Sequence, residues 1–355
     1  MILHVRFISE NRGAATRYRI HHHAEQARAA GCATEVLPLA TAAGKLADLR
    51  RLCALDGVDL LYLHRLRLTT YTLPLLLAAR ARRIPVVFDS DDLVWDAAER
   101  QYNQLDTHYD AGTVQALLAE TRRTRLLMRL ADAFVFATPY LAALAQQQFR
   151  QPAHVHLNAL GDELCALSAT AQPRALDGQV LIGYFSGTAH VHNDDLARVA
   201  KALATTLDRF ARCQIVLYGG VALPAELACF GERVTRRDMV RWQELPAQIA
   251  RVDINIAPLV DNPQRRAKSA VKYLEAAAVG VPTLASTLDP YAIIHDGVTG
   301  MLADDTHGWA QRLALLVTNR DLRLRLAASA RADVLTNHTT AARSARFGRL
   351  VRGIM

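Results

Sequence analysis

Short apolar runs alternate with longer amphipathic stretches along most of the chain. Runs of about four to eight apolar residues bounded by polar or turn residues are typical of buried strands. We expect strands in the first half at 2–8, 60–64, 86–90, 133–138 and 154–158, with helices at 16–30 and 72–83. This alternation of strand and helix predicts a parallel sheet covered by helices on both faces.

The alternation stops once and then starts again. Residues 159–178 contain small residues, Pro173 and Gly178, and are interpreted as an inter-domain linker. We expect further strands at 180–187, 214–220, 253–259 and 282–286, with helices at 194–207 and 268–280 and a helical tail from about Trp309. The predicted organisation is an α/β chain with domains at 1–158 and 179–336 and a C-terminal helix over 337–355 that returns to the first domain.

The bulk composition narrows the class of protein. The chain has 355 residues, of which 51% are hydrophobic and 21% charged, as in ordinary globular proteins of two domains. The sequence contains no run of about 18 apolar residues, so we expect no membrane-spanning helix. The first residues resemble a strand rather than a signal peptide. The five cysteines are scattered without a CxxC pair, which favours reduced thiols in a cytoplasm over a disulfide framework or a zinc site.

The net charge of +8 favours anionic partners such as nucleotide phosphates or acidic lipid headgroups. A charge that serves only solubility explains it equally well. No long Lys/Arg block and no basic stripe interleaved with aromatic residues occurs, which argues against nucleic acid. We therefore expect a cytoplasmic protein with weak, salt-sensitive association with an anionic membrane surface, at the inner face of the membrane.

Cations crowd the beginning of the helix predicted at 268–280. Ser269 is a good N-cap, but Lys272 stands where a capping box has Glu or Gln, and a cation there opposes the helix dipole. A bound phosphate would offset this unfavourable interaction with the helix dipole. The backbone N–H groups of the helix start and the two ammonium groups would bind the phosphate jointly. Lys268, Lys272 and Glu275 project from one helix face. We interpret this face as a site for a nucleoside diphosphate, with Glu275 on the ribose; the alternative is a solvated Lys272–Glu275 pair.

The stretch APLVDNPQRRAKSAVKYLEAAAVGVPTLAS (257–286) resembles the donor-binding helix of GT-B-fold glycosyltransferases of the retaining family four. Other segments resemble the family in the expected order, so that the resemblance covers most of the chain: 16–20, 85–96, 156–160, 182–195 and 297–316. The resemblance implies two Rossmann-like domains whose parallel sheets face a central cleft. It also implies transfer of a sugar from a nucleoside diphosphate donor to a hydroxyl of a glycan or lipid-linked acceptor, with retention of configuration, in polysaccharide or lipopolysaccharide synthesis.

The resemblance also assigns roles on the donor side. It gives Glu275 the nucleotide ribose, whereas Ala267 stands where the family often has the first Glu of a Glu-x7-Glu pattern. The loop after the strand at 180–187 would let its backbone approach a diphosphate through Ser186, Gly187, Thr188 and His190. An ordinary strand-to-helix turn is the alternative. The basic pair usual in this loop is absent, which leaves Lys268 and Lys272 as the main cations.

The acidic stretch DSDD supplies Asp89, Asp91 and Asp92 at the end of a predicted strand. A DxD pattern is the metal signature of GT-A glycosyltransferases, but three residues are weak evidence, and GT-B enzymes bring the diphosphate to protein cations without a metal or another cofactor. We expect these carboxylates to contact the acceptor or to act as a base for its hydroxyl. Helix capping by Asp91 or Asp92 is the alternative.

Further cleft candidates come from the first helix and from the third predicted strand. Arg17, Tyr18 and Arg19 begin the helix and are expected to approach the donor phosphates or an anionic acceptor, with a plain surface position as the alternative. His64 and Arg65 end a strand and are expected to face the cleft. The three histidines at 21–23 are not expected to bind metal, because consecutive helix positions point in different directions.

Two other classes of function stay open on the same fold. A non-hydrolysing sugar-nucleotide epimerase would interconvert donors without an acceptor, and Ala267 together with the missing basic pair leaves room for that chemistry. A catalytically silent protein would bind nucleotide or glycan without turning it over. Product analysis separates the first from a transferase, and nucleotide binding without turnover identifies the second.

Overall fold

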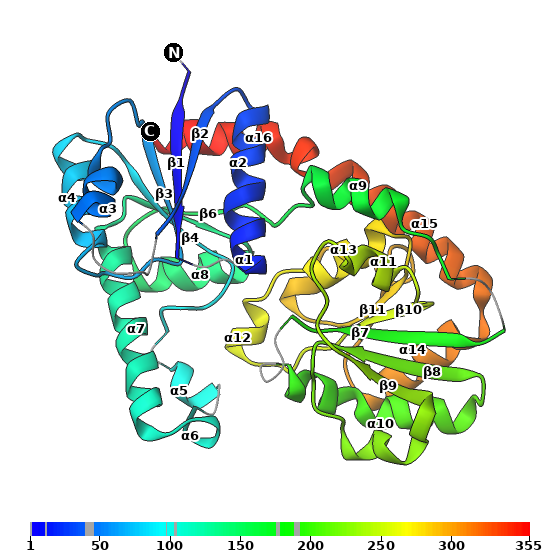
Figure 1. Ribbon diagram of the computed structural model, residues 1–355. Helices are drawn as coiled ribbons and strands as arrows, with labels where there is room; N and C mark the ends of the chain where they lie inside the picture. The colour runs from blue at the N-terminus through cyan, green and yellow to red at the C-terminus, as the bar shows by residue number, and fades with distance from the viewer. Residues whose placement is uncertain are drawn as a thin grey trace. The chain divides into compact units, whose positions relative to one another are not determined.

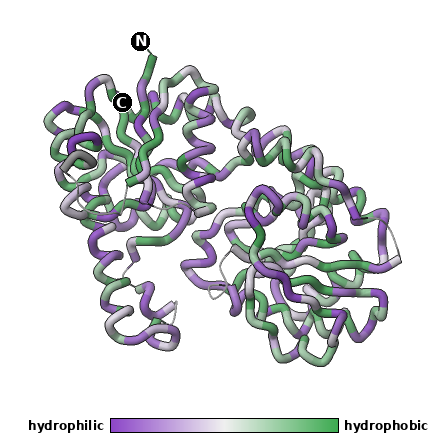
Figure 2. The backbone as a smooth tube through the Cα atoms, viewed as in Figure 1, coloured by the Kyte–Doolittle hydropathy of each residue, from purple (hydrophilic) through white to green (hydrophobic). Residues whose placement is uncertain are grey.

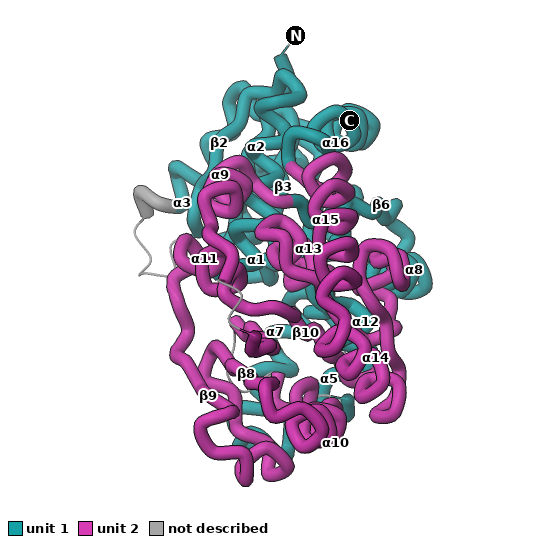
Figure 3. Tube along the Cα trace, turned by 90° about the vertical axis from the view of Figure 1, so that its right-hand side faces the viewer, with its two compact units in different colours: residues 1–159, 262–269, 340–355 teal, residues 160–261, 270–339 magenta. Residues whose placement is uncertain are grey.

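The apolar runs form two six-stranded parallel sheets, each within its own compact unit. The computed structural model describes residues 2–10, 13–39, 46–96, 98–102, 105–174, 178–187 and 192–355. Unit 1 comprises residues 1–159, 262–269 and 340–355, and unit 2 comprises residues 160–261 and 270–339 (Figure 3). Three separate segments of the chain therefore contribute to unit 1.

Unit 1 carries the sheet with strand order β2-β1-β3-β4-β5-β6 (Figure 1). The strands are β1 His4–Ser9, β2 Ala33–Pro38, β3 Leu60–His64, β4 Val86–Ser90, β5 Ala133–Phe136 and β6 Ala153–Val155. The helical elements are α1 Ala14–Thr16, the π-helical turn η1 Arg17–His21, α2 His22–Ala29, α3 Leu46–Cys53, α4 Thr72–Ala81, α5 Glu99–Tyr102, α6 Leu105–His108, α7 Ala111–Leu130, α8 Pro139–Gln148, α12 Pro263–Arg266 and α16 Thr340–Ile354.

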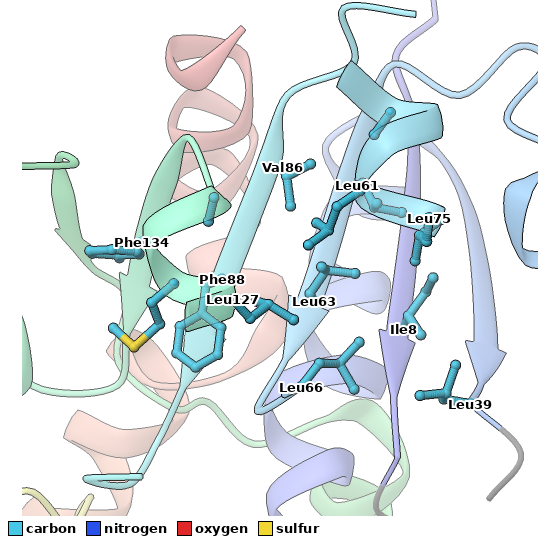
Figure 4. Close-up of a cluster of buried hydrophobic side chains, with 14 of the residues drawn as sticks. Ile8, Leu39, Leu61, Leu63, Leu66, Leu75, Val86, Phe88, Leu127 and Phe134 are labelled. Carbon is cyan, nitrogen blue, oxygen red and sulfur yellow. The ribbon is translucent and has the colours of Figure 1, made fainter. Parts of the chain in front are cut away.

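Both faces of the unit 1 sheet are buried at its central strands, which explains why β3, β4 and β5 consist mostly of apolar residues. On one face Leu61 and Leu63 of β3 pack with Phe88 and Phe134 (Figure 4). On the other face Tyr62 and its neighbours lie under α2 and α16. In Figure 2 the central strands accordingly carry the hydrophobic colours.

Unit 2 carries the sheet with strand order β12-β11-β10-β7-β8-β9. Its strands are β7 Val180–Phe185, β8 Cys213–Tyr218, β9 Val234–Arg237, β10 Ile254–Ala257, β11 Thr283–Ser286 and β12 Met301–Ala303. Its helices are α9 Asp162–Thr170, α10 Asn193–Arg209, α11 Leu245–Ile249, α13 Val271–Ala278, α14 Thr306–Thr318 and α15 Arg320–Asn337, with 3₁₀ turns η2 Ala225–Arg233 and η3 Asp289–Tyr291.

In each sheet, successive strands add on one side of the first strand and then on its other side. In unit 2 the resulting switch point lies between β7 and β10, and in unit 1 it lies between β1 and β3. Ligands of open parallel sheets bind outside the carboxyl ends of the strands at such a point. We therefore expect ligand contacts from the residues that end β7 and β10, and from those that end β1 and β3.

The predicted strands at 60–64 and 86–90 coincide with β3 and β4, whereas β2, β9 and α7 fall in stretches to which no element was assigned. The predicted linker over 159–178 is corrected by α9, which belongs to unit 2 and buries Leu164. The sequence of α9 is rich in Ala, Ser and Thr and gives little amphipathic contrast. The last helix, α16, belongs to unit 1.

Gly219, directly after β8, is required by its surroundings. Its φ is +96°, and a Cβ there would lie 2.0 Å from the backbone oxygen of Ser186. Gly297 also has a positive φ, of +74°, but has open space around it. We expect Gly219→Ala to lower the free energy of unfolding by about 1–3 kcal/mol more than Gly297→Ala, because only the first adds overpacking to backbone strain. Denaturant unfolding of both variants measures the difference, and equal losses would contradict the predicted close approach.

Among the described residues, no helix combines the length and apolar character needed to cross a bilayer. The same part of the chain holds no cluster of three or more His, Cys, Asp or Glu side chains placed to bind a metal ion.

Candidate functional site

Asn255 fixes the beginning of α13 at the switch point of unit 2. It lies in the middle of β10 and is 1% exposed. Its side-chain amide donates to the backbone oxygen of Lys272 at 3.3 Å and to Oγ1 of Thr283 at 3.0 Å. This buried amide of β10 thus hydrogen-bonds both α13 and β11, and positions the start of the helix relative to the sheet.

Lys272 points from the first turn of α13 toward the end of β7. Its ammonium nitrogen lies 4.3 Å from the ring centroid of Tyr184, a distance at which a cation is attracted to an aromatic face. Glu275 follows three residues later on the same helix, and both side chains are half-buried. A cation and a carboxylate therefore stand one turn apart beside the carboxyl end of β7.

The loop after β7 begins at the same place. Ser186 is buried, and its backbone N–H donates to the oxygen of Tyr218 at 3.2 Å, whereas Gly187 is exposed. The predicted phosphate contacts of Thr188 and His190 lie outside the described residues.

Two further buried polar side chains hold the loop that follows β10. Asp195, in the first turn of α10, accepts hydrogen bonds from the backbone N–H of Val260 at 2.9 Å and from Nδ1 of His192 at 2.8 Å. Oγ of Ser286 accepts from the N–H of Leu259 at 2.9 Å. Asn255, Asp195 and Ser286 were missed as positioning residues; the available signal was a polar residue at a buried position, such as Asn255 within an apolar strand.

The expected roles of Ser269 and Lys268 need correction. Helix α13 begins at Val271, and Ala270 occupies the N-cap without a side-chain cap. Oγ of Ser269 instead accepts from Nδ2 of Asn158 at 2.9 Å, within unit 1. The segment 262–269 as a whole packs with unit 1, so these side chains meet partners that are distant in sequence.

Lys268 and Ala267 likewise belong to unit 1. Nζ of Lys268 donates to Oδ2 of Asp92 at 2.8 Å, so a protein carboxylate already engages the ammonium group expected to hold phosphate. Ala267 is fully buried in the hydrophobic cluster of unit 1. A side chain at position 267 therefore packs in the core of this structure and does not line a ligand site.

Asp89 is the centre of a buried polar cluster at the end of β4. It pairs in register with His64 of β3, and the period of two along β3 places Tyr62 and His64 on the same face. Asp89 accepts hydrogen bonds from the Tyr62 hydroxyl at 2.7 Å and from Nδ1 of His64 at 2.9 Å. Arg19 donates to the same carboxylate twice, from Nε at 3.0 Å and Nη2 at 2.5 Å.

This cluster corrects the expected roles of Arg19 and Asp89. Arg19 has 0% exposure and also donates to the backbone oxygen of His156 at 2.6 Å and to Asn158 at 3.0 Å. Burial alone would raise the pKa of Asp89, but the Arg19 guanidinium outweighs it and holds that pKa below its usual range. A fully paired, ionised carboxylate without exposure is a structural anchor, so neither residue is available to donor phosphates or to an acceptor.

His64 and Asp91 connect this anchor to the surface of unit 1. Because Nδ1 of His64 is held by Asp89, its Nε2 faces the other way, 3.9 Å from Oδ1 of Asp91. Nε2 has no hydrogen-bond partner among the described residues. The Asp91 side chain is 14% exposed and lies 3.6 Å from the Arg65 guanidinium. Of the three aspartates, Asp91 therefore combines partial exposure with a neighbouring imidazole.

Three side chains from other segments engage Asp92. Besides Lys268, the amide of Gln264 donates to it, and the Arg65 guanidinium lies 3.7 Å away. Burial would raise the pKa of Asp92, but Lys268 and then Arg65 more than offset this effect, and the pKa lies below its usual range. Asp92 thus anchors the segment 262–269 to the end of β4.

The depressed pKa of Asp92 predicts an acid-dependent loss of stability. A carboxyl group with a lower pKa in the folded state stabilises the fold above its unfolded value, about 3.9, and this contribution disappears as the pH falls through the folded value. We expect Asp92→Asn to be less stable than wild type at neutral pH and to lose less stability on acidification from pH ~5 to ~3. Thermal unfolding across this range tests it; parallel pH curves would contradict the assigned ion pair.

Tyr18 and Arg17 of η1 were also predicted to contact a ligand. Tyr18 is 2% exposed and packs edge-on against His22, with ring centroids 4.9 Å apart. The Arg17 guanidinium lies 5.3 Å from the Tyr18 ring. Tyr18 is thus a core residue rather than the ligand contact that was expected, whereas Arg17 is half-buried.

One family model matches part of the second half of the chain. Residues 180–319 match the model of glycosyl transferases group 1. No curated protein matches this sequence.

Solved structures show that the whole chain has the GT-B fold of these glycosyltransferases. Anabaena Alr3699/HepE, solved in complex with UDP and glucose, has a TM-score of 0.66 at 13% identity and covers 99% of this chain and 100% of its own. Sucrose-phosphate synthase from Thermosynechococcus elongatus has a TM-score of 0.67 at 14% identity, with 99% of each chain covered. A putative UDP-N-acetylglucosamine 2-epimerase from Listeria monocytogenes has a TM-score of 0.55 at 14% identity, covering 100% of this chain and 96% of its own. The chain thus has the GT-B fold.

Proposed function

We propose that this protein is a glycosyltransferase that moves a sugar from a nucleoside diphosphate donor to a hydroxyl of a glycan or lipid-linked acceptor, with retention of configuration. The observation that carries the proposal is the placement of Lys272 and Glu275 on the helix that begins at the switch point of unit 2. We further propose that the reaction serves the synthesis of a cell-surface polysaccharide or lipopolysaccharide, at the cytoplasmic face of a membrane.

Lys272 would hold the diphosphate of the donor. Its ammonium group lies beside Tyr184, and the N–H groups that begin α13 have no side-chain cap. Both features favour an anion at this helix start. Negative charge grows on the leaving diphosphate in the transition state, so a cation fixed there lowers the barrier as well as binding the donor. In this proposal protein groups neutralise the diphosphate, and no metal ion or other cofactor takes part.

Glu275 would accept hydrogen bonds from the two ribose hydroxyls. A carboxylate offers two acceptor oxygens, which matches the two neighbouring hydroxyls of a ribose. It stands one turn beyond Lys272, on the same side of α13. The HepE structure with UDP and glucose supports a donor of the nucleoside diphosphate class for this fold.

Asp91 would contact the acceptor hydroxyl on unit 1. Its side chain is partly exposed, and His64 and Arg65 lie within 4 Å of it, whereas the equally exposed Asp92 is held by Lys268. Nδ1 of His64 hydrogen-bonds the Asp89 carboxylate, which leaves Nε2 to hydrogen-bond an acceptor beside Asp91. In a retaining reaction the donor phosphate would take the proton of the hydroxyl, and Asp91 would orient that hydroxyl.

Sugar-nucleotide epimerisation is the second candidate function. It is favoured by the likeness to the putative 2-epimerase and by Ala267, which replaces a carboxylate often present in the glycosyltransferase pattern. Such an enzyme would convert one nucleotide sugar into another without an acceptor.

Nuclear magnetic resonance with ¹³C-labelled nucleotide sugars separates the two candidates. The purified protein is incubated with each donor, alone and with a mixed glycan and lipid acceptor pool. The proposal predicts label in an acceptor product with the anomeric configuration of the donor, and no change in donor alone. Conversion of the donor to an isomer without acceptor would establish the epimerase, and an inverted product would overturn retention.

A further inference from the structure

The part of unit 1 around the edge strand β6 is formed by segments without acidic residues. No Asp or Glu occurs between Asp132 and Asp162, and none occurs after Asp333. These segments provide α8, β6 and α16. Helix α16 carries an arginine at every third position from 343 to 352. Positive charge is therefore concentrated where no acidic side chain of the same segments can neutralise it.

Helix α16 uses one side for packing and leaves another open. Phe347 and Val351, four residues apart, are fully buried in the cluster shared with α2. Gly348 allows a close approach, since a Cβ there would lie 2.6 Å from that of Ala30. The open side carries four residues at the spacing of a single helix face: Arg346, Arg349, Leu350 and Gly353.

A groove of about 700 Å³ separates this open side from β6. Its other wall is formed by Ala153, His154 and Val155. β6 ends the strand order of its sheet, so among the described residues no strand covers its outer edge. The groove is therefore lined by both apolar and basic side chains, and its volume is that of a small-ligand site.

Two of the four arginines of α16 are either hydrogen-bonded within unit 1 or buried. Arg352 donates to the backbone oxygen of Ala30 at 2.8 Å, and Arg343 is 9% exposed. The two arginines that line the groove, Arg346 and Arg349, are exposed and form no ion pair within the described ranges of the chain. Their guanidinium groups are one turn apart, a spacing that suits joint binding of a phosphate.

We propose that the groove between β6 and α16 binds the phosphate of an anionic lipid headgroup at a membrane surface. Arginine forks match phosphate oxygens, and the apolar wall of Val155 and Leu350 suits the glycerol and upper acyl carbons beside that phosphate. Both chain ends lie at one end of unit 1 in two perpendicular views (Figures 1 and 3), and the exposed Ile2 and Met355 add apolar side chains there. This combination of basic and apolar groups favours a lipid over a soluble phosphate.

Co-sedimentation with vesicles at low salt tests the proposal. Wild type, Arg346→Glu/Arg349→Glu and Arg320→Glu/Arg325→Glu are compared on vesicles of phosphatidylcholine alone and of phosphatidylcholine with phosphatidylglycerol. The second double variant changes the same net charge at exposed positions of α15, in unit 2. We expect binding to the anionic vesicles only, a loss of at least tenfold in the groove variant, and near wild-type binding in the control variant. Unchanged thermal unfolding of both variants shows that the surface changes leave the fold intact.

Three results would overturn the proposal. Equal losses in both double variants would indicate general charge attraction, and equal binding to neutral vesicles would remove the role of phosphate. Protection of the groove by glycerol phosphate in hydrogen exchange, without vesicle binding, would identify a soluble phosphate ligand instead. None of these measurements uses donor turnover, so their failure is distinguishable from failure of the proposed transferase activity.

Discussion

Replacing Lys272 with alanine is expected to weaken nucleoside diphosphate binding about 10- to 150-fold, which corresponds to about 1.5–3 kcal/mol for a hydrogen bond to a charged group. The ammonium group lies 4.3 Å from the Tyr184 ring, beside the N–H groups that begin α13. Affinity for the nucleoside without phosphates should change little, because the proposal assigns Lys272 to the diphosphate rather than to the base. Calorimetric titration with a nucleoside, its monophosphate and its diphosphate measures the difference.

Lys201 provides the matched control for this result. It is an exposed lysine of α10 in the same unit, and Lys201→Ala removes the same charge without approaching the switch point. Equal diphosphate affinity in the Lys272 variant and wild type would remove the phosphate role. Equal weakening of diphosphate binding in both lysine variants would attribute the effect to the overall charge of the unit rather than to the position of Lys272.

Replacing Asp89 with asparagine is expected to lower the free energy of unfolding by about 3–5 kcal/mol, because it leaves the guanidinium of Arg19 buried without its counterion. Arg19 and Asp89 both have 0% exposure and share two hydrogen bonds. The Tyr62 hydroxyl and His64 lose the charge of their common acceptor as well. Denaturant unfolding monitored by circular dichroism measures this loss.

The chain contains an exposed counterpart of this ion pair. Arg100 and Asp106 also share two hydrogen bonds, at 2.8 and 2.9 Å, but both side chains are more than half exposed. Asp106→Asn should therefore have a much smaller effect, because water screens exposed pairs. If Asp89→Asn destabilises the protein no more than Asp106→Asn does, the buried cluster is not the anchor of unit 1.

The sequence predicted the elements whose signal is local. β3 and β4 are short apolar runs bounded by polar residues, and their bounds follow directly from that contrast. β9 was missed because its sequence VTRR is mostly polar and exposed, as an edge strand of a sheet can be. The helical signal of α9 was hidden by its small residues, so a linker was predicted where the chain forms a helix.

The site was harder to predict, because ion pairs join residues that are far apart in the sequence. Lys268 looked like a phosphate ligand beside Lys272, yet its partner is Asp92 of unit 1. Arg19 looked exposed at a helix start, yet Asp89 and Asn158 surround it. A buried charge and an exposed one have the same local pattern, and only the tertiary structure distinguishes them.

The most direct test of the central claim is a mass-spectrometric screen of turnover with a panel of nucleotide sugars. Each donor is incubated with and without the mixed acceptor pool, with wild type and with Glu275→Ala. The account predicts release of a nucleoside diphosphate together with the matching sugar adduct in wild type, and loss of both in the variant. Turnover of the same donor by Glu275→Ala at the wild-type rate would contradict the placement of the nucleotide on α13.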